Sequence, residues 1–171
     1  MGPLEVSRSG SAVPVGGPRQ RAVLALLLLE ANRVVSMDRL ADDVWDGHPP
    51  EGWATTLQIY VFHLRQALEP DRARGAAGEV LATRDRGYLL RVDREHVDAA
   101  LFQDGFTAGR AALEAGRYAE AAETLRTALC RWRGAVLADL ADYAFTRPEA
   151  ARLEELRLAA LEARSGSWHA R

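Results

Sequence analysis

One stretch of the chain, TTLQIYVFHLRQAL (55–68), combines a helical apolar stripe with side chains suited to nucleic-acid contacts. Four apolar residues recur at three- and four-residue steps, which predicts a helix with one buried face: Leu57, Val61, Leu64 and Leu68. The remaining positions are not the Glu, Lys and Ala residues that fill a merely solvated helix face. They are hydrogen-bonding, aromatic and cationic: Thr55, Thr56, Gln58, Ile59, Phe62, His63 and Arg65. The sequence therefore predicts that this outward face binds a partner.

The side chains of this face match the chemistry of the DNA major groove, which is wide enough for one α-helix. Gln58 is suited to a paired contact with adenine, Ile59 and Phe62 to a thymine methyl group, and Arg65 to a phosphate. Each assignment has a structural alternative. These are solvation for Gln58, a domain interface for Ile59 and Phe62, and ion pairs of Arg65 with Asp42 or Glu69.

The segments before this helix predict a short hairpin and two further helices. Alternating residues from Leu4 to Val15 with a Ser9-Gly10 turn predict the hairpin, and Arg19–Ala31 predicts an apolar, central helix. Ser36 is suited to cap a second helix that buries Leu40 and Val44. The order before the DNA-reading candidate is therefore helix, turn, helix.

A second hairpin is predicted after the third helix, from Val80 to Val92, with a turn at Asp85–Gly87 that carries Arg84 and Arg86. Three helices followed by a hairpin constitute a winged helix-turn-helix, in which the third helix enters the major groove and the hairpin reaches backbone or minor groove. Tyr88 is expected to be a core anchor of this wing. We expect Arg84 and Arg86 to contact DNA.

From Asp98 onward the sequence predicts helical segments and no strands, with breaks at Gly116-Arg117 and over 134–146. Its alanine- and leucine-rich segments are Ala99–Ala115, Ala119–Trp132 and Pro148–Arg164. Gly109 precedes Ala121, Leu125 and Ala128 at a spacing that fits a tetratricopeptide-type helix pair, although any close helical hairpin predicts much the same. The expected fold is mainly α with small β elements: a winged helix-turn-helix domain over 1–94 and a tetratricopeptide-like helical domain over 98–171.

Composition and charge narrow the function classes. The chain has 171 residues, 48% of them hydrophobic, with a net charge of −2 in which every basic residue is arginine. That total is not the basic signature of a nucleic-acid binder, but residues 36–53 hold one Arg against five acids and residues 54–94 hold seven against five. The longest apolar run, Ala22–Leu29, is too short to cross a bilayer, so we expect a cytoplasmic protein without membrane contact.

Recognisable catalytic and metal-binding patterns are missing from the sequence. The four histidines are scattered, no Cys/His spacing fits zinc, and Gly16-Gly17 lacks the lysine of a phosphate loop. Cys130 lies among apolar neighbours and is expected to be a small buried residue. The sequence predicts no enzyme, no cofactor and no metal.

Longer motifs carry a resemblance to a known family. Residues 3–94, through GPRQRAVLALLLLEANRVVSMDRLADDVW, TLQIYVFHLRQALEPDR and TRDRGYLLRV, resemble the OmpR-type DNA-binding domain of the Streptomyces antibiotic regulatory proteins. Residues 96–164, through ALEAGRYAEAAETLRTAL, WRGAVLADLADYAF and ARLEELRLAALEAR, resemble the front of their bacterial transcriptional activation domain. The resemblance implies a transcriptional activator of a biosynthetic gene cluster that binds double-stranded DNA with direct repeats, as a homodimer on DNA, and recruits RNA polymerase.

The same resemblance implies a polymerase contact for the loop between the second and third helices. Its residues combine acids, a histidine and an aromatic ring: Asp46, Gly47, His48, Glu51 and Trp53. Such a surface suits a basic partner. The alternative is a solvated connector with Trp53 packed on the core.

Three departures from the family pattern modify these expectations. Phe62-His63 stands where the family usually has Ser-Arg, so a lost phosphate contact should weaken DNA binding roughly tenfold at physiological salt. If His63 meets phosphate instead, affinity should rise between about pH 7.5 and pH 6. The chain also starts at Met1-Gly2-Pro3, where relatives carry several more residues that form a first strand, so either the true start lies upstream or the small sheet lacks an edge. Its activation domain is about half length and ends in a Ser165–Arg171 tail that is expected to break the helical pattern.

These departures support an alternative function. A truncated chain of this kind would act as a protein-interaction module through its helical half, or as a competitor of longer relatives that does not bind DNA productively. Salt-dependent DNA binding separates the two hypotheses, because phosphate contacts release counterions and protein interfaces of this kind do not.

Overall fold

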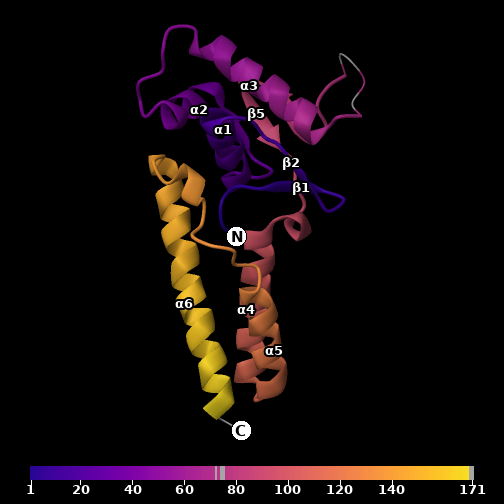
Figure 1. Ribbon diagram of the computed structural model, residues 1–171, viewed down its shortest axis with the longest axis vertical. Coiled ribbons are helices and arrows are strands. Elements are labelled where there is room, and N and C mark those ends of the chain that lie inside the picture. The colour runs from indigo at the N-terminus through magenta and orange to yellow at the C-terminus, as the bar shows by residue number, and fades with distance from the viewer. Residues whose placement is uncertain (72, 74–75, 170–171) are drawn as a thin grey trace. The chain divides into compact units, whose positions relative to one another are not determined.

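The computed structural model describes residues 1–71, 73 and 76–169 and divides the chain into two compact units (Figure 1). The winged-helix unit consists of Leu4–Val92 with Asp139–Arg147. The helical unit consists of Met1–Pro3, Asp93–Ala138 and the segment from Pro148 onward. The domain limits expected from the sequence, 1–94 and 98–171, stay a prediction. Two short segments belong to the other unit than their sequence neighbours: Met1–Pro3 to the helical unit and Asp139–Arg147 to the winged-helix unit.

Three helices form the body of the winged-helix unit: α1 (Pro18–Leu29), α2 (Met37–Val44) and α3 (Trp53–Leu68). Pro18 occupies the first turn of α1, and the Ser36 side chain accepts a 3.2 Å hydrogen bond from the Arg39 amide to cap α2. Every side chain from Ala22 to Leu27 is buried, which makes α1 the central helix of the unit. The predicted order of helices is confirmed.

The described strands of this unit form two small antiparallel sheets. The first pairs β1 (Val6–Arg8) with β2 (Ser11–Val13), and the second has the order β3 (Val34–Ser36), β5 (Gly87–Leu90), β4 (Leu81–Arg84). A Cβ atom at Gly87 would lie 2.2 Å from the Val35 carbonyl oxygen, so the close pairing of β5 with β3 requires glycine there. The β4–β5 hairpin is the predicted wing.

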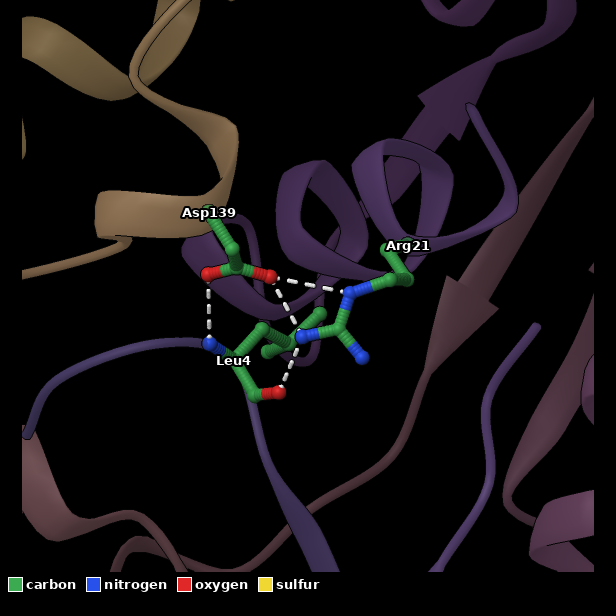
Figure 2. Close-up of polar contacts among 3 residues, drawn as sticks. All are labelled: Leu4, Arg21 and Asp139. Atoms are coloured by element: carbon green, nitrogen blue, oxygen red, sulfur yellow. Dashed lines mark hydrogen bonds and ion pairs between the residues drawn. The ribbon is translucent and has the colours of Figure 1, made fainter. Parts of the chain in front are cut away.

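A segment from late in the chain, Asp139–Arg147, folds as part of the winged-helix unit and is called the strap below. Its Leu140 and Thr146 side chains are fully buried. The Asp139 carboxylate accepts hydrogen bonds from the Leu4 amide at 2.8 Å and from Arg21 Nε at 2.9 Å, while Arg21 Nη2 donates to the Leu4 carbonyl oxygen at 2.5 Å (Figure 2). Asp139, Leu4 and Arg21 are therefore mutually hydrogen bonded, and these bonds hold the strap against α1 and the segment before β1.

The helical unit contains η1 (Arg94–His96), α4 (Asp98–Glu114), α5 (Tyr118–Leu129) and most of α6 (Arg147–His169). A Cβ atom at Gly109 would lie 2.6 Å from Leu125 Cγ, and one at Gly105 would lie 2.9 Å from Ala128 Cβ. Glycine on α4 thus lets α5 approach closely, which explains the small-residue spacing seen in the sequence. The buried core comprises Met1, Phe102, Leu125, Ala128, Leu153 and Ala160.

Two expectations for this unit were wrong. Cys130 is exposed, because it follows the buried positions Ala121, Leu125 and Ala128 at the end of α5 and falls outside their stripe. Helix α6 does not stop before Ser165 but continues to His169, since a single glycine, Gly166, costs a long helix only about 1 kcal/mol. The last two residues of the predicted tail, 170 and 171, lie outside the described residues. Within the described residues, no helix has the length and apolar character needed to span a membrane.

Candidate nucleic-acid interface

The predicted reading face of α3 is exposed along most of its length. Leu57, Val61 and Leu64 are at most 1% exposed and form the seam that faces the core, whereas Leu68, predicted in the same stripe, is half-buried. The predicted base-reading side chains that lie on the solvent side are Thr55, Gln58, Ile59, Phe62 and His63. Ile59 and Phe62 are 48% and 51% exposed and, three residues apart on one helix, form an apolar patch rather than isolated surface residues. The structure therefore brings a mixed polar and apolar surface together on one helix face.

Phe62 and His63, the pair that departs from the family pattern, contact each other. Their ring centroids are 5.7 Å apart, and the ring planes are inclined by 57°. An inclined aromatic contact of this kind is favourable and restrains both rings. The pair thus presents one broad aromatic surface with an imidazole edge in place of a small residue and a fixed cation.

Helix α3 is preceded by the N-cap residue Gly52, whose φ of 73° is left-handed, and no side-chain hydrogen bond caps the helix among the described residues. Thr56 is half-buried, and its hydroxyl donates a long 3.5 Å bond to the Gly52 carbonyl oxygen within the first turn. An uncapped helix start carries partial positive charge and exposed amide groups, which attract phosphate. Thr55, on this first turn, is exposed beside that end.

Arg65 is placed differently from the other predicted contacts. Its side chain is half-buried and points at the wing: Nε donates to the Leu81 carbonyl oxygen at 2.8 Å, and Nη2 donates to the Thr83 hydroxyl at 2.7 Å. The guanidinium carbon also lies 5.9 Å from the centre of the Tyr88 ring. Burial raises the pKa of the Tyr88 phenol, and the positive charge of Arg65 lowers that pKa in part. Tyr88 is buried as expected of a core anchor.

The wing tip carries the two other predicted cations, Arg84 and Arg86, on either side of Asp85. Asp85 has a left-handed φ of 46°, which makes the tight turn between β4 and β5. Both arginines are exposed, and the Arg84 guanidinium donates only to the backbone of its neighbour Thr83, at 3.1 Å, among the described residues. Within that part of the chain neither forms an ion pair, so both charges are available to phosphate.

The loop between α2 and α3 presents acids to solvent on a defined backbone. Asp46 and Gly47 have left-handed φ values of 52° and 74°, and His48 Nδ1 lies 2.7 Å from the Asp46 carbonyl oxygen. Asp46, Gly47, His48 and Glu51 are exposed, whereas Trp53 is half-buried. Trp45, just before the loop, stacks on Tyr60 of α3 with centroids 6.3 Å apart. Sequence reasoning missed this stack, because Trp45 follows the end of α2 whereas Tyr60 lies in α3.

Sequence reasoning also missed two side chains that join α3 to the wing. Thr83 receives the Arg65 hydrogen bond, and the Glu69 carboxylate Oε1 accepts the amides of Glu79 and Val80, both at 2.6 Å. The signal available in the sequence was an acidic residue at the very end of a helix, followed by a loop rather than by another helix.

Comparisons with known proteins agree with this architecture. Residues 14–90 match the family described as transcriptional regulatory protein, C terminal, and residues 97–168 match the bacterial transcriptional activator domain. The chain is 39% identical over 169 residues to the transcriptional regulatory protein EmbR of Mycobacterium tuberculosis, covering 96% of this chain and 42% of EmbR. It is 37% identical over 167 residues to the regulatory protein DnrI of Streptomyces peucetius, covering 96% of this chain and 61% of DnrI.

A solved structure gives the same result in three dimensions. The structure of Mycobacterium tuberculosis EmbR in complex with a low-affinity phosphopeptide matches with a TM-score of 0.89 and 38% identity, over 97% of this chain and 43% of that one. The chain spans less than half the length of EmbR. All these relatives are named as regulators and none as an enzyme. With an OmpR-type winged helix followed by a bacterial transcriptional activator domain, the chain belongs to the Streptomyces antibiotic regulatory protein family of transcriptional regulators.

Proposed function

We propose that the winged-helix unit binds double-stranded DNA with direct repeats, with α3 in the major groove and the wing on backbone or minor groove, and that the chain activates a biosynthetic gene cluster. The observation that supports this most is the composition of the exposed α3 face, opposite a fully buried leucine seam. Gln58 and His63 offer hydrogen bonds to base edges, and Ile59 and Phe62 offer apolar contact to thymine methyl groups.

The wing supports the same proposal. Thr83 of the wing accepts a hydrogen bond from Arg65 of α3. Arg84 is the next residue along the wing, so it lies close to the recognition helix. Two exposed arginines there suit the phosphates that flank a groove occupied by α3.

The partners beyond DNA belong to the same proposal. The exposed acids of the loop, Asp46 and Glu51, with His48 and Trp53, suit a basic surface of RNA polymerase. Direct repeats suit two copies of the chain side by side on DNA. A regulator of this kind acts in the bacterial cytoplasm, where the chromosome lies.

A selection followed by a salt titration tests the DNA-binding proposal. The full chain is used to enrich duplexes from a random pool, and the anisotropy of a labelled enriched duplex is then followed at several salt concentrations. We expect a binding constant that falls as a power of salt concentration, and a slope reduced by about one for Arg84→Ala. Arg110→Ala is the matched control, since Arg110 lies in the helical unit and pairs with Glu114.

One observation favours the alternative of a protein-interaction module: the two large apolar side chains on α3 are about half exposed, as they would be in an unoccupied protein interface. The same titration decides between them. Failure to enrich any duplex, or binding that does not respond to salt, would reject the DNA-binding proposal in favour of the interaction module.

A further inference from the structure

Side chains at the C-terminal turn of α3 bind the root of the wing, by which we mean residues 78–83. These side chains are distinct from the predicted base-reading ones. Arg65 holds the outer edge of β4 at two points, the Leu81 carbonyl oxygen and the Thr83 hydroxyl. Its guanidinium also faces the Tyr88 ring of β5. One side chain of α3 therefore contacts both strands of the wing.

Glu69, one turn further along, holds the segment that leads into β4. A single carboxylate oxygen accepts the backbone amides of Glu79 and Val80 at 2.6 Å each. Hydrogen bonds to a charged carboxylate are stronger than neutral ones, so this clamp fixes the start of the strand. Arg65 and Glu69 together fix the position of β4 relative to α3.

Two neighbouring features are built around the same junction. Gly78 is buried, and a Cβ atom there would lie 2.9 Å from Arg65 Nε and 2.1 Å from the Leu81 carbonyl oxygen. On the other strand pair, Arg8 of β1 donates to the last carbonyl groups of α3, at 2.8 Å to Ala67 and 2.6 Å to Leu68. The end of α3 is thus held from two sides, and only glycine fits where Arg65 passes.

We propose that Arg65 and Glu69 are positioning residues that set the angle of the wing relative to the recognition helix, so that Arg84 and Arg86 reach phosphate while α3 lies in the groove. This inference rests on the proposed DNA binding. Sequence reasoning assigned Arg65 to phosphate directly, whereas its hydrogen bonds to β4 assign it a role through the wing. A wing held in place before binding loses less conformational freedom on binding, and its contacts then contribute fully to affinity.

The two roles of Arg65 predict different behaviour for Thr83→Val. This variant keeps the charge of Arg65 and removes the acceptor of Nη2. If Arg65 positions the wing, Thr83→Val should weaken binding of the enriched duplex by about threefold. If Arg65 grips phosphate directly, releasing it from Thr83 should leave affinity unchanged or improve it.

A double-mutant cycle supplies the second readout. Arg84→Ala is measured in the wild-type chain and in Arg65→Met, which keeps much of the packing over Tyr88. For a positioning role, the effect of Arg84→Ala should fall from about tenfold to less than about threefold, because the displaced wing has already lost that contact. Gln58→Ala is the control partner, since Gln58 reads from the exposed helix face; its effect should be the same in both backgrounds.

Amide hydrogen exchange of the free chain separates this inference from the proposed function. Arg65→Met should raise exchange rates about tenfold in the wing, 79–90, and leave α1 unchanged. If wild-type protein bound no duplex while exchange rose in this way, the proposed function would fall and the anchoring would stand. Unchanged exchange in the wing, additive effects in the cycle and a silent Thr83→Val would overturn the positioning role and return Arg65 to direct phosphate contact.

Discussion

The root and the tip of the wing use arginine in opposite ways. At the root, Arg65 is half-buried and hydrogen bonded to the backbone and side chain of β4. At the tip, Arg84 is exposed and bonds only the carbonyl group of its neighbour among the described residues. Both residues look equally suited to phosphate in the sequence. The comparison teaches that the role of an arginine depends on the acceptors near it. Where the fold places acceptors opposite the guanidinium, the arginine stabilises the fold, and where it does not, the charge stays available to a ligand.

The same contrast divides α3 itself. Its first three turns present Thr55, Gln58 and Phe62 to solvent, whereas its last turn is connected to β1, β4 and the segment before β4. The exposed side chains of the first three turns are free to adapt to DNA. The hydrogen bonds of the last turn keep the arrangement of α3 and the wing rigid. Substitutions at the root should therefore change both stability and binding, and those at the tip should change binding alone.

The largest effect is expected at Gly78. Gly78→Val places a side chain into the Leu81 carbonyl oxygen, and a backbone atom cannot move aside cheaply. We expect the free energy of unfolding to fall by more than about 2 kcal/mol, measured by urea denaturation, with DNA binding lost as well. Gly134→Ala, where no atom lies within 4 Å of the added Cβ, should change it by less than about 0.5 kcal/mol. Equal effects at the two glycines would show that the root is not tightly packed.

The central contrast is tested by comparing Arg65→Met with Arg84→Ala in the absence of DNA. Removing Arg65 leaves the Thr83 hydroxyl and the Leu81 carbonyl group without this donor, so we expect a loss of about 2 kcal/mol in unfolding free energy. Arg84→Ala should change that quantity by less than about 0.5 kcal/mol, although both variants weaken DNA binding. Similar stability losses for both would remove the distinction between root and tip.

A smaller loss is expected where the strap is fastened. Asp139→Asn removes the charge that receives Arg21 while keeping an acceptor for the Leu4 amide. Because the side chains of Arg21 and Asp139 are each about a quarter exposed, solvent screens the pair, and we expect about 1 kcal/mol in chemical denaturation. Asp142→Asn, an exposed neighbour on the same strap, serves as control and should be neutral. A neutral Asp139→Asn would mean that the strap is held by Leu140 and Thr146 alone.

The smallest effect concerns the titration of Tyr88. Burial raises its pKa above the ordinary 10.0, so its contribution to stability is complete below about pH 10 and is lost as pH rises through the folded-state pKa. Since Arg65 lowers this pKa, Arg65→Met should raise it further. Phenolate absorbance, with Tyr88→Phe subtracted to isolate the group, measures the shift. An unchanged titration would place the guanidinium too far away to act on the ring.

Local periodicity explains how much of the fold was predictable. The helix α3, the Ser36 cap and the wing turn at Asp85–Gly87 each depend on residues a few positions apart, and all three are confirmed. The apolar seam of α3 follows from the same spacing, as does the exposure of Gln58 and His63. These are the parts of the candidate site that sequence alone can place.

The remaining parts depend on segments that meet only in the folded chain. The acceptors of Arg65 lie 16 and 18 residues away, and Asp139 lies 118 residues from Arg21. No spacing rule links such positions. The prediction that Cys130 is buried was wrong for a related reason: its apolar neighbours in sequence do not lie on the same face of the helix. Roles that depend on a distant partner were therefore invisible, while roles that depend on a helix face were not.

Cleavage of DNA from a tethered reagent tests the central claim most directly. In a Cys130→Ser background, since Cys130 is exposed, single cysteines replace Phe62 or Arg86 and carry an iron chelate that generates hydroxyl radicals. Bound to the enriched duplex, position 62 should cut within the repeat from the major groove, and position 86 should cut the flanking backbone a few base pairs away. No cutting from position 62, or the same cutting pattern from positions 62 and 86, would contradict a DNA-reading role for α3.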